Sequence, residues 1–350
     1  MLVRWLLAFA LALPLLAADK PNVILIFADD QGTVDAEGFG AQDLYTPNLR
    51  KLGDRGVRFS QFYVGAPVCS PSRAAMLTGR TPFRAGVPGN VPINGLGMPD
   101  EQFTIAEMLK SNGYATGIVG KWHLGEVNGG GPLDQGFDIF FGHKRGCIDN
   151  YSHFFYWSGP NVHDLWRGAE EVWEDGHYFS DLMLREAKRL HLRQPRPAHF
   201  FLYLPTSALP LQAEQEWRDY YRPALESKQM PENRFHYASL VSTLDEKVGE
   251  VLATVERLGL TDNTLIIFMS DHGLHPKNAP CSAAAAPALP RREVQPVRGR
   301  HSRRLDGRCP ASSPRRDARP VRNFDGLDAD PGRAHRASLP EGHKIDTARA

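Results

Sequence analysis

The chain has 350 residues, of which 42% are hydrophobic and 23% are charged. These values describe a folded globular protein and exclude collagen, a coiled coil and a multi-span transporter. With 41 basic and 40 acidic residues the net charge is +1, so the whole chain carries no field that would indicate a nucleic-acid partner. Four cysteines, Cys69, Cys147, Cys281 and Cys309, are too scattered for a disulfide scaffold, and no pair has zinc-site spacing.

The first eighteen residues have the layout of a cleaved secretory signal. Arg4 precedes an apolar run from Trp5 to Leu16 that ends in two alanines, and the run is short for a membrane span. A buried N-terminal helix is the alternative, which Pro14 and the polar residues 19–21 disfavour. We therefore expect a secreted or periplasmic protein without a stable membrane anchor, whose mature chain begins near Asp19.

The first predicted element of the mature chain is a buried strand. Residues 22–28, NVILIFA, form a continuous apolar run, which is typical of a strand covered on both faces of a parallel sheet. Asp29 and Asp30 follow at the strand end, where α/β proteins place their chemistry. Two adjacent carboxylates repel each other unless a cation lies between them, and oxygen ligands suit Ca²⁺ or Mg²⁺. Paired acids at a strand end also serve as turn formers.

Helical and strand patterns alternate along the following 230 residues or so of the sequence. Helices are predicted from Pro47 to Gly53 or Gly56 and over residues 105–111, 178–192 and 237–258. Core strands are predicted over residues 57–64, 114–119, 199–204 and 264–269. This alternation predicts an α/β fold with one large mixed, mostly parallel sheet sandwiched between helices.

The composition changes from about Cys281 onward. Phe324 is the one aromatic residue left, and arginine, alanine and proline replace periodic apolar positions. One interpretation is a disordered basic tail. The other is a frameshift, because a one-base shift can turn Gly326–Arg336 into the helix-like DWMPTLAELTG. We hypothesise that residues 281–336 are frameshifted and that residues 337–346 are back in frame.

The most informative stretch is CSPSRAAMLTGR at residues 69–80. Cys69 lies just before a helix that Pro71 and Ser72 are expected to begin, so free backbone N–H groups would face an anion there. A lone cysteine in this position is ordinarily a packing residue. The full string, however, resembles the signature of the type I sulfatases of the alkaline phosphatase superfamily, whose cysteine is oxidised after synthesis to Cα-formylglycine.

Two further motifs agree with this resemblance. Residues 113–125, GYATGIVGKWHLG, resemble the second sulfatase signature; alone, Lys121 and His123 would be read as a solvated lysine and a packed histidine. A polar cluster at residues 270–273, SDHG, follows another predicted strand. The resemblance implies a divalent cation, with Ca²⁺ favoured but Mg²⁺ left open. Its implied ligands are Asp29, Asp30, Cys69, Asp271 and His272, although many members have Asn at the last position.

The resemblance also implies a mechanism, that of a sulfuric ester hydrolase acting on aryl or sugar sulfates. Hydrated formylglycine at the position of Cys69 would supply a hydroxyl nucleophile, and the cation would neutralise sulfate oxygens. Arg73 and Lys121 would hold the formylglycine and the sulfate, while His123 would position or deprotonate the diol. The implied partner is a formylglycine-generating or sulfatase-maturating enzyme.

A stretch of aromatic and polar residues bears on the substrate. Residues 147–157, CIDNYSHFFYW, are similar to the substrate-facing region of the arylsulfatase and N-acetylgalactosamine-6-sulfatase groups. Its aromatic rings, with Asp149, Asn150 and His153, suit a sugar ring. A core cluster beneath a loop explains the pattern equally well, and Cys147 either lines the pocket or packs.

Two departures from the family pattern leave alternatives open. Residues 205–212, PTSALPLQ, hold no histidine where the family has a leaving-group acid. The second sulfate-binding lysine would fall in the suspected frameshift, where Lys277 has the wrong spacing. The expected domains are a signal peptide at 1–18, a sulfatase catalytic domain at 19–280 and an anomalous tail at 281–350, with the C-terminal subdomain missing or scrambled. The alternatives are an inactive truncated remnant and a phosphonate or phosphodiester hydrolase of the same superfamily.

Overall fold

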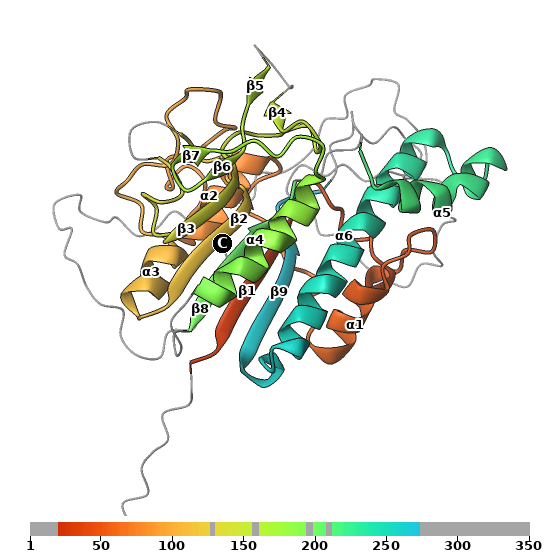
Figure 1. Cartoon of the computed structure of the whole chain (residues 1–350), viewed down its shortest axis with the longest axis horizontal. Coiled ribbons are helices and arrows are strands. Elements are labelled where there is room, and N and C mark those ends of the chain that lie inside the picture. The colour runs from red at the N-terminus through yellow and green to blue at the C-terminus, as the bar shows by residue number, and fades with distance from the viewer. Residues whose placement is uncertain (1–19, 127–129, 156–160, 194–198, 208–211, 274–350) are drawn as a thin grey trace, which may run out of the picture.

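A single mixed sheet organises the protein. The computed structural model describes residues 20–273 apart from 127–129, 156–160, 194–198 and 208–211, so the predicted signal segment and the tail at 281–350 lie outside the described residues. Seven strands follow the order β7-β6-β3-β2-β8-β1-β9 (Figure 1). Their bounds are β1 Asn22–Ala28, β2 Ala115–Lys121, β3 Ile139–His143, β6 Trp166–Arg167, β7 Glu170–Glu171, β8 Phe200–Pro205 and β9 Thr264–Ser270.

The five strands from β3 to β9 are parallel, whereas β6 and β7 pair antiparallel at the other edge. The predicted α/β fold with a large, mostly parallel mixed sheet is therefore confirmed. In register, Phe27 of β1 faces Pro205 of β8 and Met269 of β9. Because these strands run the same way, the residues that follow them meet at one edge of the sheet.

Helices cover both faces of the sheet. Their bounds are α1 Pro47–Arg55, α2 Cys69–Thr78, α3 Ile105–Ser111, α4 Phe179–Arg193, α5 Gln215–Glu226 and α6 Glu232–Arg257. Ile24 and Ile26 of β1 pack in one core cluster with α4 and α6, which face the viewer in Figure 1. Leu25 and Phe27 pack on the opposite face with α2 and α3. Alternate side chains of β1 therefore enter two different cores, which is why its sequence is apolar without interruption.

Several predicted boundaries are confirmed, and two predicted helix starts are wrong. Helix α3 spans the predicted residues and begins with a capping box between Thr104 and Glu107. Helix α6 starts at Glu232, five residues before the predicted start, because Pro231 ends the preceding loop and the polar residues after it continue the helix. Helix α2 starts at Cys69 itself rather than at Pro71, and the Ser70 N–H already donates to Asn90 Oδ1 at 3.0 Å.

The predicted strand at residues 57–64 is absent, since the structure describes these residues and assigns no strand to them. Val57 is 78% exposed and Phe59 is 65% exposed. The physical reason is that a strand needs a paired neighbour, and residues 57–64 pair with neither edge of the sheet, which ends at β7 and β9. The short strand β3 and helix α5, with Pro223 inside it, were not predicted.

Above the sheet, a two-stranded sheet pairs β4 Phe154–Phe155 with β5 Val162–His163. Figure 1 shows it at the top of the molecule, away from α1 and α3. None of the helices in the described part of the chain has the length and apolar character needed to cross a membrane.

Candidate active site

Three strand ends and one helix start converge on a single cluster of polar side chains. Asp29 and Asp30 follow β1, Lys121 ends β2, and Asp271 and His272 follow β9. Cys69 and Arg73 come from the first turns of α2. The structure thus brings all the predicted site residues to one edge of the sheet, with His123 two residues beyond β2.

Arg73 ties the elements together from beneath. Its side chain is fully buried, and Nη2 lies 2.9 Å from Asp29 Oδ1 and 3.0 Å from Asp271 Oδ2. Nη1 donates to the Lys121 carbonyl oxygen at 3.0 Å. Burial alone would lower the pKa of Arg73, but the two carboxylates raise it above its usual value. Arg73 therefore stays charged and holds the ends of β1, β2 and β9 together.

Lys121 links Asp29 to Cys69. Its Nζ lies 2.8 and 2.9 Å from the two carboxylate oxygens of Asp29 and 3.3 Å from Cys69 Sγ. Burial would raise the pKa of Asp29, but the charges of Lys121 and Arg73 hold it well below its usual range. The site thus contains a fixed buried ammonium beside the sulfur atom.

Cys69 is poorly suited to act as a thiolate. Its Sγ lies between Lys121 Nζ and His272 Nε2, the latter at 3.4 Å. Burial raises the pKa of the thiol to about 12, although the charge of Lys121 opposes the shift. Because thiols react as thiolates, the unmodified side chain is a weak nucleophile at neutral pH.

Asp30 has a strained backbone and an unsatisfied carboxylate. Its φ is 62°, a left-handed conformation that aspartate tolerates better than most residues. Its N–H donates to Asp271 Oδ1 at 3.0 Å, while its own buried Oδ1 accepts no hydrogen bond. Burial and the neighbouring charge of Asp29 raise the pKa of Asp30 to about 7. His272 Nδ1 lies 3.2 Å from Asp30 Oδ1 without forming a hydrogen bond to it.

His272 directs its Nε2 atom at the Sγ of Cys69, 3.4 Å away. Its Nδ1 lies 2.8 Å from the Gly273 carbonyl oxygen, which only accepts, so Nδ1 carries the hydrogen and Nε2 has the lone pair. Burial lowers the pKa of His272. The imidazole is therefore neutral, which is the form that binds a metal.

The donor set fits a divalent cation. One ligand atom each from Asp29, Asp30, Cys69 and His272 lies within 4.8 Å of the others. Asp30 Oδ1, which accepts no hydrogen bond, and His272 Nε2, whose lone pair faces Cys69 Sγ, supply acceptors that a cation would satisfy. Asp271, also predicted as a ligand, borders this group, with oxygens that accept from Asp30 N–H and pair with Arg73.

Two buried histidines flank the cluster. His123 has φ 56°, and its Nδ1 has no hydrogen-bond partner. Burial and the charges of Lys121 and Arg73 lower its pKa well below the usual value. His143, which the sequence analysis did not single out, ends β3, and burial lowers its pKa to about 3. The sequence signal for His143 was its place at the end of the short apolar run of β3.

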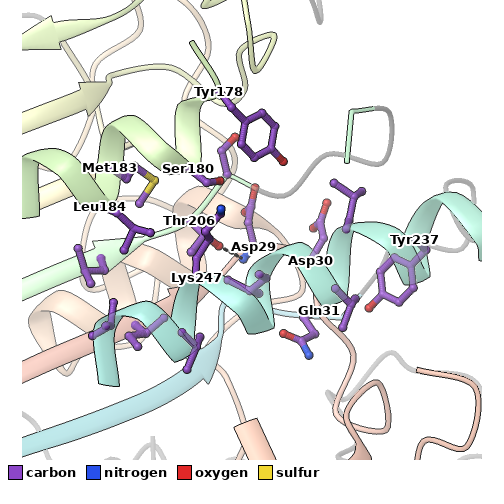
Figure 2. Close-up of a pocket in the computed structure, with 18 residues that line it drawn as sticks. Asp29, Asp30, Gln31, Tyr178, Ser180, Met183, Leu184, Thr206, Tyr237 and Lys247 are labelled. Carbon is purple, nitrogen blue, oxygen red and sulfur yellow. Dashed lines mark hydrogen bonds between the residues drawn. The ribbon is translucent and has the colours of Figure 1, made fainter. Parts of the chain in front are cut away.

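A cavity reaches the acidic side of the cluster. Figure 2 shows Asp29, Asp30 and Thr206 lining it, with Met183 from α4 and Lys247 from α6. The dashed contact is the Asp29 N–H donating to Thr206 Oγ1 at 3.3 Å. Most of the remaining lining is apolar and comes from α4 and α6. Cys69 is not part of this lining.

The aromatic stretch after Cys147 is folded into a compact turn. Asp149 Oδ1 accepts the N–H groups of Tyr151 and Ser152 at 3.0 and 2.8 Å. Cys147 and His153 are buried, which favours the packing interpretation for Cys147 and places the His153 ring away from solvent. Tyr156 and Trp157 lie outside the described residues, as do Lys277 and the middle of the segment 205–212.

Comparison with known proteins gives one consistent family. A family model described as Sulfatase matches residues 21–304. Human arylsulfatase A is 36% identical over 294 residues, covering 76% of this chain and 55% of the relative. Human N-acetylgalactosamine-6-sulfatase is 34% identical over 292 residues, covering 75% and 52%, and mouse arylsulfatase J is 33% identical over 266 residues, covering 73% and 43%. The chain spans about half the length of these curated relatives.

Solved structures give the same picture of the fold. The crystal structure of Ps i-CgsB in complex with k-i-k-neocarrahexaose has a TM-score of 0.67 and 33% identity, and the match covers 74% of this chain and 60% of that one. The PsFucS1 sulfatase from Pseudoalteromonas sp. has a TM-score of 0.59 at 23% identity, covering 72% and 55%, and supports the fold alone.

Proposed function

Since the chain belongs to the sulfatase family, we propose that it is a sulfuric ester hydrolase that cleaves an aryl or sugar sulfate monoester at the position of Cys69. The observation that carries the proposal is the placement of Cys69 Sγ, 3.3 Å from Lys121 Nζ and 3.4 Å from His272 Nε2. An oxygen in place of this sulfur would lie between a fixed cation and the candidate metal ligands.

The nucleophile is proposed to be a modified residue rather than the thiol. The raised pKa of Cys69 argues against thiolate chemistry at neutral pH. Oxidation to Cα-formylglycine by a maturating enzyme, followed by hydration, would supply a hydroxyl at this point. Lys121 Nζ, already directed at the sulfur, would hydrogen-bond that hydroxyl and a sulfate oxygen as a preorganised cation.

The neighbouring residues divide the remaining tasks. Arg73 already pairs with Asp29 and Asp271. Its proposed role is therefore to hold the cluster in place, and not only to bind sulfate. His123 has a bare, buried Nδ1 and a lowered pKa, so it would accept a hydrogen bond or a proton from the diol.

Asp29, Asp30, His272 and the group at position 69 would hold the cation, with Asp271 bordering them. When bound, a divalent ion supplies charge neutralisation for sulfate oxygens and acidifies a coordinated hydroxyl. We propose Ca²⁺, because the acids supply several oxygens and Ca²⁺ tolerates irregular coordination better than Mg²⁺.

The wider setting is proposed on the same basis. Residues 19–280 would form the catalytic domain of a secreted or periplasmic enzyme. A sulfated glycan is the favoured substrate class, because a structure at 33% identity holds a neocarrahexaose. The competing reading is an inactive remnant, which the absence of histidine from residues 205–212 supports.

The test is to produce the full chain together with a maturating enzyme and assay it with Ca²⁺ on aryl sulfates and sulfated oligosaccharides. We expect a formylglycine aldehyde at position 69 in the peptide mass spectrum, and turnover that Cys69→Ala abolishes. The matched Cys147→Ala variant should still carry the aldehyde at position 69.

The outcomes separate the alternatives. An aldehyde-bearing chain that hydrolyses phosphonate or phosphodiester but no sulfate ester would replace the proposal with the superfamily alternative. A folded, aldehyde-bearing chain without any turnover would identify the remnant.

A further inference from the structure

A second group of metal-binding side chains lies apart from the candidate active site, beside the two-stranded sheet. His153 precedes β4, His163 ends β5, and Asp175 lies in the turn before α4. One ligand atom from each of the three lies within 4.8 Å of the other two. The two histidines are buried, whereas Asp175 is exposed.

Hydrogen bonds fix which nitrogen of each ring is bare. His153 Nε2 lies 3.1 Å from the His177 carbonyl oxygen, and His163 Nδ1 lies 2.8 Å from Glu171 Oε1. Because both oxygens accept, these nitrogens carry the hydrogens. The opposite nitrogens, His153 Nδ1 and His163 Nε2, are buried and accept no hydrogen bond. Two lone pairs and a carboxylate therefore face one another, an arrangement that is unfavourable without a cation.

Contacts restrain the His163 ring and the His153 backbone. The His163 ring stacks on Trp173 with centroids 3.8 Å apart and planes at 6°. The carbonyl oxygen of His153 accepts the Asp164 N–H at 3.0 Å. His153 also has φ 60°, and such strained non-glycine positions cluster at functional sites. The stacking restrains the His163 ring, and the backbone contact and φ fix the main chain from which the His153 ring projects.

We propose that His153 Nδ1, His163 Nε2 and the Asp175 carboxylate bind one Zn²⁺ ion, with a fourth position open on the exposed side of Asp175. Two imidazoles and one carboxylate are ligands that suit zinc. The hydrogen bonds to the Glu171 carboxylate and to a backbone carbonyl are the outer contacts that ligating histidines ordinarily make. Ca²⁺ takes more oxygen ligands than this group offers, so the two centres would take different metals.

The ion would fasten three segments that follow one another in the sequence: the turn before β4, strand β5 and the turn before α4. No disulfide joins two of the described residues, so none performs this task in the described part of the chain. The site is independent of the proposed sulfate chemistry, since it shares no residue with the cluster around Cys69.

The test uses the full chain without a polyhistidine tag, in a Cys69→Ser background that removes a competing thiol. Metal is stripped with a chelator, excess Ca²⁺ is added, and Zn²⁺ binding is measured by titration and by metal analysis. We expect one Zn²⁺ per chain. Asp175→Asn, at an exposed position, should weaken binding at least about tenfold, whereas the exposed control Glu170→Gln should not.

Two further measurements separate ligation from a general structural effect. With Co²⁺ in place of Zn²⁺, the intense visible absorption of a tetrahedral site should appear in the parent and in Glu170→Gln, and vanish in His163→Gln. Glu171→Gln, a positioning change, should weaken Zn²⁺ binding roughly 10–100-fold without abolishing it. The proposal would be overturned if the parent, Asp175→Asn and His163→Gln bound equal amounts of Zn²⁺. It would also be overturned if the parent bound no Zn²⁺ once it was saturated with Ca²⁺.

Discussion

Arg73 shows how much of the site depends on single buried charges. It pairs with Asp29 and Asp271 at 2.9 and 3.0 Å, and none of the three side chains is more than 1% exposed. Removing one partner from a buried ionic group leaves the others uncompensated, which costs far more than the pair is worth as a whole. Arg73 is therefore a structural as well as a chemical residue.

Arg73→Leu is expected to reduce the free energy of unfolding by about 3–5 kcal/mol, because two carboxylates lose their buried cation. Urea denaturation measures this change. The control is Lys188→Leu, which breaks a half-exposed pair with Glu250 and should cost less than about 1 kcal/mol. Equal losses in the two variants would contradict the role assigned to Arg73.

Because His143 is buried with a lowered pKa, the free energy of unfolding is expected to depend on pH. The pKa of His143 is about 3 in the folded chain and about 6.5 when unfolded, so between these values only the unfolded state binds the proton. Stability is complete above pH 6.5 and falls as the pH drops through this window. His143→Gln should lower the slope of unfolding free energy against pH by up to about 1.4 kcal/mol per pH unit, measured by urea denaturation from pH 4 to 6. Identical slopes would show that His143 does not contribute.

At the scale of elements, three neighbouring strands approach closely beside the site. A Cβ on Gly120 of β2 would lie 1.9 Å from the Pro205 carbonyl oxygen at the end of β8. A Cβ on Gly142 of β3 would lie 2.0 Å from the Gly120 carbonyl oxygen. Both glycines have positive φ. The strand ends carrying Lys121 and His143 are therefore brought together by the absence of side chains between them.

Gly120→Ala is expected to force β2 away from β8 and to displace Lys121, the next residue. We predict a loss of at least about 1–3 kcal/mol of stability, as for overpacked cores, and a fall in sulfate turnover of about 10²–10³-fold if Lys121 is moved from its contacts. Gly89→Ala is the control, since a Cβ there meets nothing within 4 Å. A Gly120→Ala enzyme as stable and active as Gly89→Ala would refute the close-approach argument.

The elements that could be predicted were those whose position follows from a local sequence pattern, without reference to tertiary neighbours. Strand β1 and helix α3 have continuous or periodic apolar patterns with clear ends, and both were predicted at their observed bounds. The apolar pattern at 57–64 failed because a sequence pattern does not reveal whether a neighbouring strand is available. Strand β3 was missed because its five residues give a short signal.

The candidate site was predictable to the extent that motifs follow strand ends. Asp29 stood out as part of a paired acid at a strand end, whereas Lys121 and Asp271 were assigned through the resemblance to the sulfatase motifs, which agreed with their position at predicted strand ends. The contact of Arg73 with Asp271 and the facing nitrogens of His153 and His163 were not predictable, because they depend on tertiary neighbours and ring orientation.

At the scale of the whole molecule, the cation site joins elements from opposite ends of the described chain. Any ligand that binds only the folded state stabilises it, by about 2.7 kcal/mol at a hundred times its dissociation constant. Because the proposed ligands come from the ends of β1 and β9 and the start of α2, cation binding should stabilise the whole sheet against unfolding.

Saturating Ca²⁺ should therefore raise the melting temperature, and a chelator should reverse the rise. Asp30→Asn should remove most of this response, since it removes the charge of the unpartnered carboxylate. Asp262→Asn, an exposed change remote from the proposed ligands, should respond to Ca²⁺ as the parent does. A Ca²⁺ response unaffected by Asp30→Asn would place the ion elsewhere.

Because β1 lies between β8 and β9, it cannot complete its pairing until the last strand of the sheet has been synthesised. The Asp30 N–H finds its acceptor on Asp271 only across 241 residues of sequence, and such distant contacts slow folding because long loops must close first. At a synthesis rate of about 5–20 residues per second, the ribosome needs roughly 10–50 seconds to make that stretch. During this interval β1 lacks its outer neighbour, and Cys69 lacks the histidine that will later flank it. A nascent chain therefore offers its N-terminal half to solvent, and to any enzyme that modifies it, well before the sheet is complete.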